Sequence, residues 1–149
     1  MQKLNLPEYH FRTIQKQKVE LIFDEFRRRW VVLTPEEWVR QNFLKYLQEV
    51  KGCPKPLMAI EKVVEINGLQ QRFDLLVYDR KGKPLMVAEF KAPEVAINQA
   101  VFDQVIRYNN SLMAPYILVS NGMEHFVCRI DFKGGSTEYL KEIPIFNQL

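Results

Sequence analysis

Three charged residues lie at the ends of two apolar runs that a tight turn joins. Asp74 lies just before the first run, and Glu89 and Lys91 lie at the end of the second. The residues between the runs include Lys81-Gly82, which indicates a β-hairpin. Charged groups at the ends of buried strands are costly unless they are paired or bound to metal. This hairpin therefore constrains both the fold of the chain and its chemistry.

The position of the turn predicts which residues of the hairpin face one another. A turn centred on Lys81-Gly82 places Asp74 directly opposite Glu89, and it places Arg72 opposite Lys91. Directly opposed residues have Cβ atoms roughly 4.5–5.5 Å apart, and alternate residues of a strand share a face. We therefore expect two acids and two basic residues on one face of the hairpin.

This group of charges has two interpretations. Two carboxylates at this spacing could hold Mg²⁺, with Mn²⁺ as a substitute, because Mg²⁺ uses one or two carboxylates, water and a substrate phosphate. Such a metal polarises a phosphodiester and acidifies a bound water, and Lys91 could orient that water or stabilise phosphoryl charge. The alternative is a structural ion-pair network in which Asp74 bonds to Lys91 or Arg72. The spacing alone leaves both interpretations open.

The composition is that of a soluble, cytoplasmic, single-domain protein. The 149 residues are 47% hydrophobic and 26% charged, and no apolar run approaches the length of a membrane span. Cys53 and Cys128 are interpreted as reduced thiols, and two histidines are too few to indicate a His/Cys zinc site. The net charge of +3 only permits nucleic-acid binding. The basic run Arg27-Arg28-Arg29 is typical of a solvated strand or turn.

Hydrophobic periodicity predicts an α/β (α+β) fold, in which helices flank a mixed sheet and an extra β-hairpin precedes them. Residues 9–33 alternate with period two, as in two or three strands. Thr34 begins a helix that runs from Pro35 to about Val50, and Pro93 begins a second that runs to about Tyr108. Strands are expected at 57–66, 71–78, 85–90, 116–120, 125–132 and near 138–143. We expect residues 1–33 to be an extension packed on one core domain, 34–149.

These residues resemble the PD-(D/E)XK nuclease superfamily and, more narrowly, the N-terminal domain of type I restriction enzyme R subunits and its stand-alone relatives. The resemblance covers about residues 34–125 and rests on Pro35–Gln41, Asp74, Glu89-Phe90-Lys91, Gln104–Tyr108 as a Q-x-x-x-Y motif, and Pro115–Gly122. It implies a restriction-endonuclease-like fold and Mg²⁺-dependent endonuclease activity on DNA. Phe73 replaces the proline of the superfamily motif. No G-x-x-x-x-G-K-[ST] loop is present, so the ATP-driven motor activity is not expected.

The resemblance also implies roles for individual residues. Asp74 and Glu89 would ligate the metal, with the carbonyl oxygen of Phe90 as a third ligand, and Lys91 would be the catalytic lysine. Gln104 and Tyr108 lie four apart on one helix face and would support the site or contact DNA, together with Arg72. The alternative for the glutamine and the tyrosine is a place in the core.

The acid expected from the first helix is Glu36, because it lies on the same helix stripe as Val39 and Phe43. Glu37 is better explained as half of a capping box with Thr34. We therefore predict a metal-dependent deoxyribonuclease with DNA as its partner. The alternative is a catalytically silent module on the same fold that binds nucleic acid or protein. Other subunits of a restriction-modification enzyme, or a second copy of the chain, are compatible partners.

Overall fold

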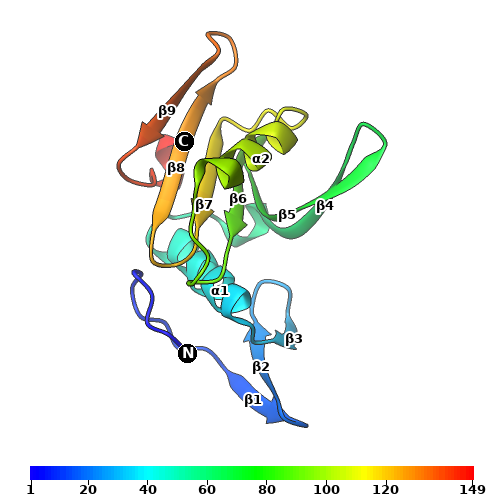
Figure 1. Cartoon of the computed structure of the whole chain (residues 1–149), viewed down its shortest axis with the longest axis vertical. Coiled ribbons are helices and arrows are strands. Elements are labelled where there is room, and N and C mark those ends of the chain that lie inside the picture. The colour runs from blue at the N-terminus through cyan, green and yellow to red at the C-terminus, as the bar shows by residue number, and fades with distance from the viewer.

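A six-stranded mixed sheet forms the centre of the computed structural model, which describes residues 1–149 (Figure 1). Its strands, in spatial and chain order, are β4 (Met58–Ile66), β5 (Leu69–Tyr78), β6 (Pro84–Phe90), β7 (Tyr116–Ser120), β8 (His125–Asp131) and β9 (Ser136–Leu140). Only β6 and β7 pair in parallel, because the chain between them crosses over one face of the sheet as a helix. The predicted α/β fold with a mixed sheet is confirmed.

One helix covers each face of this sheet. The helix α1 (Pro35–Glu49) packs Val39, Phe43 and Leu47 against inward-facing residues of β5, β6 and β7. On the other face, α2 (Gln99–Asn109) contributes Phe102 and Val105 to a second apolar cluster. None of the helices combines the length and the apolar character that a membrane-spanning segment requires.

The ends of the two helices differ in how well they were predicted. Thr34 caps α1 as expected, since its hydroxyl accepts a 3.0 Å hydrogen bond from the backbone of Glu37. The second helix begins at Gln99, so the predicted start at Pro93 is wrong. Asn98 caps it by accepting a 3.1 Å bond from Val101, because an Asn side chain satisfies a free N–H at a helix start and the proline cannot.

Two of the predicted strands have different bounds in the structure. Residues 55–57 form η1 (Lys55–Leu57), so the strand expected from residue 57 begins at Met58. At the other end of the chain, β9 stops at Leu140 and is followed by η2 (Phe146–Gln148). The predicted strand at 138–143 is therefore displaced toward the N-terminus.

The N-terminal extension is a three-stranded antiparallel sheet rather than a two-stranded hairpin. Its strands are β1 (Thr13–Lys16), β2 (Val19–Asp24) and β3 (Arg29–Val32). The β1–β2 turn holds Gln17 and Lys18 at positive φ, and Ile22 and Asp24 are the buried residues of β2. The division of the chain at residue 33 stays a prediction.

The first residues of the chain dock onto the turn between β7 and β8. Ser120 Oγ lies 2.7 Å from His125 Nδ1, and the other ring nitrogen of His125 lies 2.7 Å from the carbonyl oxygen of Asn5. The backbone N–H of Asn5 donates to the carbonyl of Gly122 at 2.8 Å, and Leu4 is buried against the core. The polar pair Ser120–His125 therefore fixes the N-terminal segment and is used structurally.

Gly122→Ala is expected to loosen this docking. Gly122 has φ +85°, and an added Cβ would lie 2.8 Å from a methyl group of Leu4. We expect the free energy of unfolding to fall by about 1–2 kcal/mol because alanine disfavours the left-handed backbone conformation. The clash between the added Cβ and Leu4 is expected to cost about 1–3 kcal/mol more. Gly82→Ala is the matched control for thermal unfolding, because Gly82 has φ +82° and open space around it. Equal losses in the two variants would contradict the docking contact.

Candidate active site at the ends of β5 and β6

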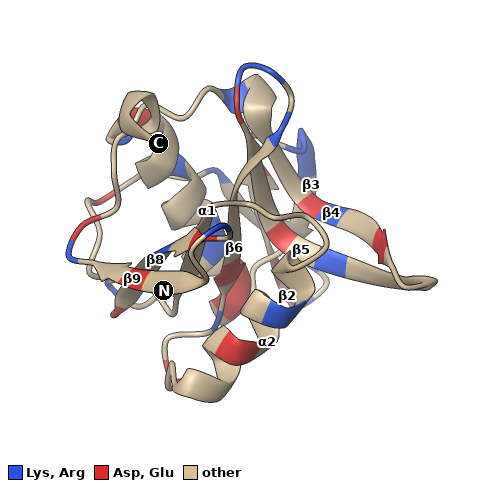
Figure 2. Cartoon of the chain, turned by 90° about the horizontal axis from the view of Figure 1, so that it is seen from above, with Lys and Arg blue, Asp and Glu red and all other residues tan.

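Asp74 and Glu89 meet where the backbone pairing of β5 and β6 ends. The predicted register is found in the pairs Leu75↔Ala88 and Leu76↔Val87. Beyond them, a carboxylate oxygen of Asp74 accepts a 2.7 Å hydrogen bond from the N–H of Phe90. In return, Glu89 Oε1 lies 3.4 Å from the backbone nitrogen of Asp74. The two acids therefore lie side by side, and acidic positions mark neighbouring β5 and β6 in Figure 2.

Glu89 is a carboxylate without a cationic partner. It forms no salt bridge, whereas Asp74 does. Burial and the neighbouring Asp74 carboxylate raise the pKa of Glu89 to about 8. A partly desolvated acid of this kind, beside a second carboxylate, either holds a proton or pairs with a cation. The pair of oxygen donors accordingly fits a divalent cation such as Mg²⁺, which needs only one or two protein carboxylates.

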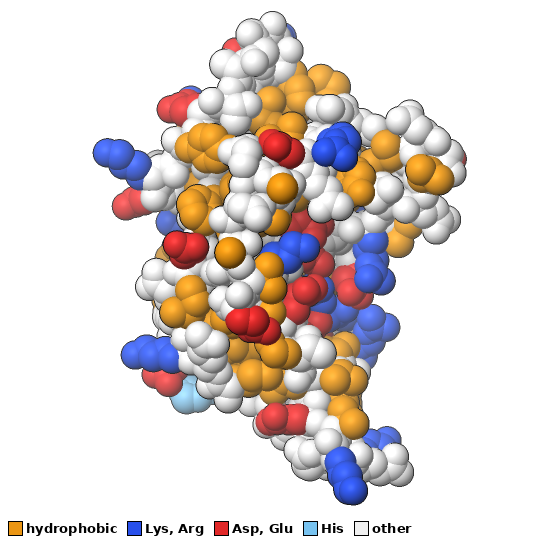
Figure 3. Space-filling view, viewed as in Figure 1, with side chains coloured by type: hydrophobic (Ala, Val, Ile, Leu, Met, Phe, Trp, Pro, Cys, Tyr) orange, Lys and Arg blue, Asp and Glu red, His pale blue; other side chains and the backbone are white.

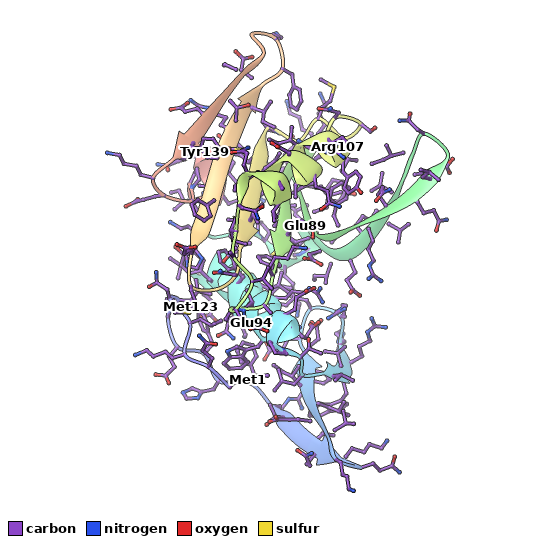
Figure 4. The ribbon with its side chains drawn as sticks, viewed as in Figure 1. Met1, Glu89, Glu94, Arg107, Met123 and Tyr139 are labelled. Atoms are coloured by element: carbon purple, nitrogen blue, oxygen red, sulfur yellow. The ribbon has the colours of Figure 1, made fainter.

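A cavity of about 230 Å³ opens between β5, β6 and α2 beside this pair. Five of the predicted site residues line it: Arg72, Glu89, Lys91, Gln104 and Tyr108. The amide of Gln104 donates to the hydroxyl of Tyr108 at 3.3 Å, as their helical spacing predicts. Figure 4 shows Glu89 between α2 and the β4–β5 hairpin, and acidic atoms gather in a hollow bordered by basic ones in Figure 3.

Lys91 contributes a positive charge that no acid neutralises directly. It follows Phe90, and its backbone N–H donates to Ser120 on β7 at 2.9 Å. Its ammonium group forms no salt bridge, although its charge acts on both Glu36 and Glu89. Lys91 is thus held in place by the sheet while its side chain faces the cavity, where it can interact with an anionic group.

Glu36 lies near Asp74 but does not complete a three-acid cluster. Burial and the charge of Asp74 raise the pKa of Glu36. Its carboxylate lies 3.5 Å from Arg40 Nη2, the same nitrogen that lies 2.9 Å from Asp74. The guanidinium therefore stands between the two acids. No group of three Asp, Glu, His or Cys side chains converges as a metal site, so a cation here would rely on Asp74, Glu89, backbone and water.

Glu37 does not form the predicted capping box, because the backbone N–H of Thr34 donates to the carbonyl of Val32 instead. Its carboxylate accepts bonds from Arg27 at 2.6 Å, from Arg40 at 2.5 Å and from Gln41 at 2.8 Å. It is buried, and these bonds leave it no freedom to turn toward Asp74. The structure thus keeps Glu37 in the interior network, whereas the side chain of Glu36 is 46% exposed and lies beside Arg40.

Sequence reasoning missed three members of this network: Arg27, Arg40 and Glu61. Asp74 does form an ion pair, but with Arg40 rather than with Lys91 or Arg72. Glu61 lies opposite Asp74 on β4, between the pairs Ile60↔Leu75 and Lys62↔Phe73, and has φ +53°. Only the spacing of Arg40 from Glu36 and Glu37, four and three residues along one helix, could have been found from the sequence.

Comparison with known proteins agrees with this arrangement of segments. The family described as type I restriction enzyme R protein N terminus (HSDR_N) matches residues 35–144. The chain belongs to this family. Every candidate residue from Glu36 to Tyr108 falls within the matched segment of the HSDR_N domain.

A solved structure shows the same fold. It is a fragment of a proposed HsdR subunit of a type I restriction enzyme from Vibrio vulnificus YJ016, with a TM-score of 0.54 and 19% sequence identity. The alignment covers 78% of this chain and 25% of that one, so this HSDR_N chain spans about a quarter of its length. A search of curated proteins finds no match.

Proposed function

We propose that this HSDR_N domain hydrolyses DNA phosphodiester bonds with the help of Mg²⁺. One observation carries the proposal: an unpaired, half-buried acid, Glu89, shares a cavity with an unpaired lysine, Lys91, directly beside Asp74. Neither group forms a salt bridge that would explain its place in the fold, so their presence together in one cavity favours a functional role. Family membership supports the same conclusion, since the enzymes for which the family is named are restriction enzymes.

The residues present suit the steps of such a reaction. Asp74 and Glu89 would hold the cation, which when bound polarises the phosphodiester and acidifies a bound water. Lys91 would place its charge against the developing charge on the phosphoryl oxygens. Gln104 and Arg72 border the same cavity and offer hydrogen-bond donors to a phosphate backbone. Tyr108 orients the glutamine through their shared bond.

Conversion of supercoiled plasmid to nicked or linear DNA tests this function. With Mg²⁺ or Mn²⁺, wild-type protein is expected to cleave at least about 10²-fold faster than Lys91→Ala, the usual effect of removing one donor that stabilises transition-state charge. Lys83→Ala is the matched control, because Lys83 is exposed in the turn at the far end of the hairpin. Equal rates for wild type and Lys91→Ala would reject the nuclease function.

The second candidate function is nucleic-acid binding without cleavage. It is favoured by Asp74, both of whose oxygens already accept hydrogen bonds, one from Arg40 and one from Phe90. In that case, DNA would bind with an affinity that falls steeply with salt, and added Mg²⁺ would produce no cleavage. Fluorescence anisotropy of labelled DNA at two salt concentrations, run beside the plasmid assay, separates the two functions.

A further inference from the structure

We propose that Arg40 is a positioning residue that fixes the Asp74 carboxylate in the orientation in which it binds a divalent cation together with Glu89. The inference rests on the proposed function, because it concerns the same cation. It assigns a role to a residue outside the cavity lining, on α1, which packs on the face of the sheet away from α2.

The geometry around Asp74 carries the inference. Its two oxygens are held by different elements: one accepts from Arg40 Nη2 at 2.9 Å, and the other accepts from the N–H of Phe90 at 2.7 Å. These two bonds fix the rotation of the carboxylate about its side-chain axis. Each carboxylate oxygen has two acceptor sites, so both bonds leave lone pairs for a cation beside Glu89.

Arg40 is itself held rigidly, which makes it suitable for this role. It is 5% exposed, and its second terminal nitrogen, Nη1, bonds to Glu37 at 2.5 Å. Glu37 also accepts a bond from Arg27 at 2.6 Å. Arg27 in turn bonds to Asp24 in the N-terminal sheet and to Glu61 on β4. Glu37 therefore holds Arg40 in place, at the edge of an ion-pair network that also reaches the N-terminal extension.

The shape of the guanidinium matters here as well as its charge. A planar guanidinium can bond Asp74 with one terminal nitrogen and Glu37 with the other, at fixed angles. A lysine ammonium is a point charge on a flexible stem and cannot reproduce both bonds. Arg40→Lys therefore keeps the charge near the cation and removes the fixed direction. Any change in metal affinity in this variant reports positioning rather than electrostatics.

The test measures Mn²⁺ binding to the whole chain by electron paramagnetic resonance, in the absence of DNA. We expect the dissociation constant of Arg40→Lys to be about tenfold higher than that of wild type, as for other groups that orient metal ligands. Arg27→Lys is the matched control, because it makes the same replacement in the same network without touching Asp74. Its Mn²⁺ affinity is expected to stay within about twofold of wild type.

The outcomes separate this inference from the proposed function. Equal Mn²⁺ affinity in wild type and Arg40→Lys overturns the positioning role and leaves the cation site standing. An equal loss in Arg27→Lys and Arg40→Lys also overturns it, because the effect then belongs to the network as a whole. Wild-type protein that binds no Mn²⁺ overturns the cation site together with the positioning role.

A measurement on wild-type protein covers the case in which Arg40→Lys does not fold. We expect Mg²⁺ to shift the NMR signals of the Arg40 guanidinium and the Phe90 amide, which hold the two oxygens of Asp74. The guanidinium signals of Arg27 are expected to stay unchanged. A Mg²⁺-induced shift at Glu89 without any shift at Arg40 would overturn the inference.

Discussion

Glu89→Gln is expected to abolish Mg²⁺-dependent cleavage and, at the same time, to stabilise the metal-free protein above pH 8. Glutamine keeps the shape of the side chain and removes its negative charge. Under the proposed function, this variant loses one of the two carboxylates that would hold the cation. That loss forfeits several kcal/mol of transition-state stabilisation, which corresponds to a rate at least about 10³-fold lower. Cleavage of supercoiled plasmid measures this effect.

The gain in stability follows from the raised pKa of Glu89. Its pKa is about 8 in the folded protein, against an ordinary value of 4.5. At neutral pH, the folded protein therefore holds a proton there that the unfolded chain releases. The stability that this proton contributes is fully present below pH 4.5 and is lost as the pH rises through about 8. Glu89→Gln removes this pH dependence, because glutamine stays neutral at every pH.

Thermal unfolding without metal, at pH 5 and at pH 9, measures the stability effect. At pH 5, the variant and wild type are expected to unfold at similar temperatures. At pH 9, the variant is expected to unfold at a temperature about 3 °C or more above that of wild type. In a chain of this size, this difference corresponds to roughly 1 kcal/mol in the free energy of unfolding. Saturating Mn²⁺ is expected to raise the unfolding temperature of wild type only.

Glu94→Gln is the matched control, because Glu94 is an exposed acid in the loop after β6. It is expected to change neither cleavage nor unfolding. A variant Glu89→Gln that unfolds earlier than wild type at pH 9 would contradict the unpaired state and the raised pKa of this acid.

The part of the site that the sequence predicted lies within one hairpin. The two neighbouring apolar runs have the expected pairing from Leu75 to Val77, and a bulge between Val77 and Tyr78 shifts the register next to the turn. Glu89 and Lys91 follow from that register, because a strand projects alternate side chains to one face. The cap at Thr34 was predictable for a similar reason: it depends on residues within one helical turn.

The part that the sequence did not predict depends on contacts between distant segments. Arg40 and Asp74 are 34 residues apart, and no local periodicity indicates which acid a buried arginine will meet. Glu61 could not be placed either, since a strand residue at positive φ departs from the alternation on which the prediction relies. The start of α2 was missed because Pro93 suits a first helical position, whereas Asn98, five residues later, caps the helix in the structure.

Arg40→Met is expected to cost about 3–5 kcal/mol in the free energy of unfolding, the usual cost of removing one partner of a buried ion pair. Glu37 and Glu61 keep Arg27 as a partner in this variant. Asp74, with a side chain only 13% exposed, keeps a single hydrogen bond from Phe90. Methionine also removes the buried Nε of Arg40, which has no hydrogen-bond partner. That gain is smaller than the cost of an uncompensated charge.

Denaturant unfolding of four proteins tests this cause: wild type, Arg40→Met, Asp74→Asn and the double variant. Asparagine at position 74 can still accept the hydrogen bond from the N–H of Phe90, but it carries no charge. We therefore expect the double variant to be about 1–3 kcal/mol more stable than the sum of the losses in the two single variants predicts. Lys45→Met is the matched control on the same helix. Its partner Glu25 is 44% exposed, and the expected loss is below about 1 kcal/mol. Additive losses in the double variant would place the cost of Arg40→Met elsewhere than at Asp74.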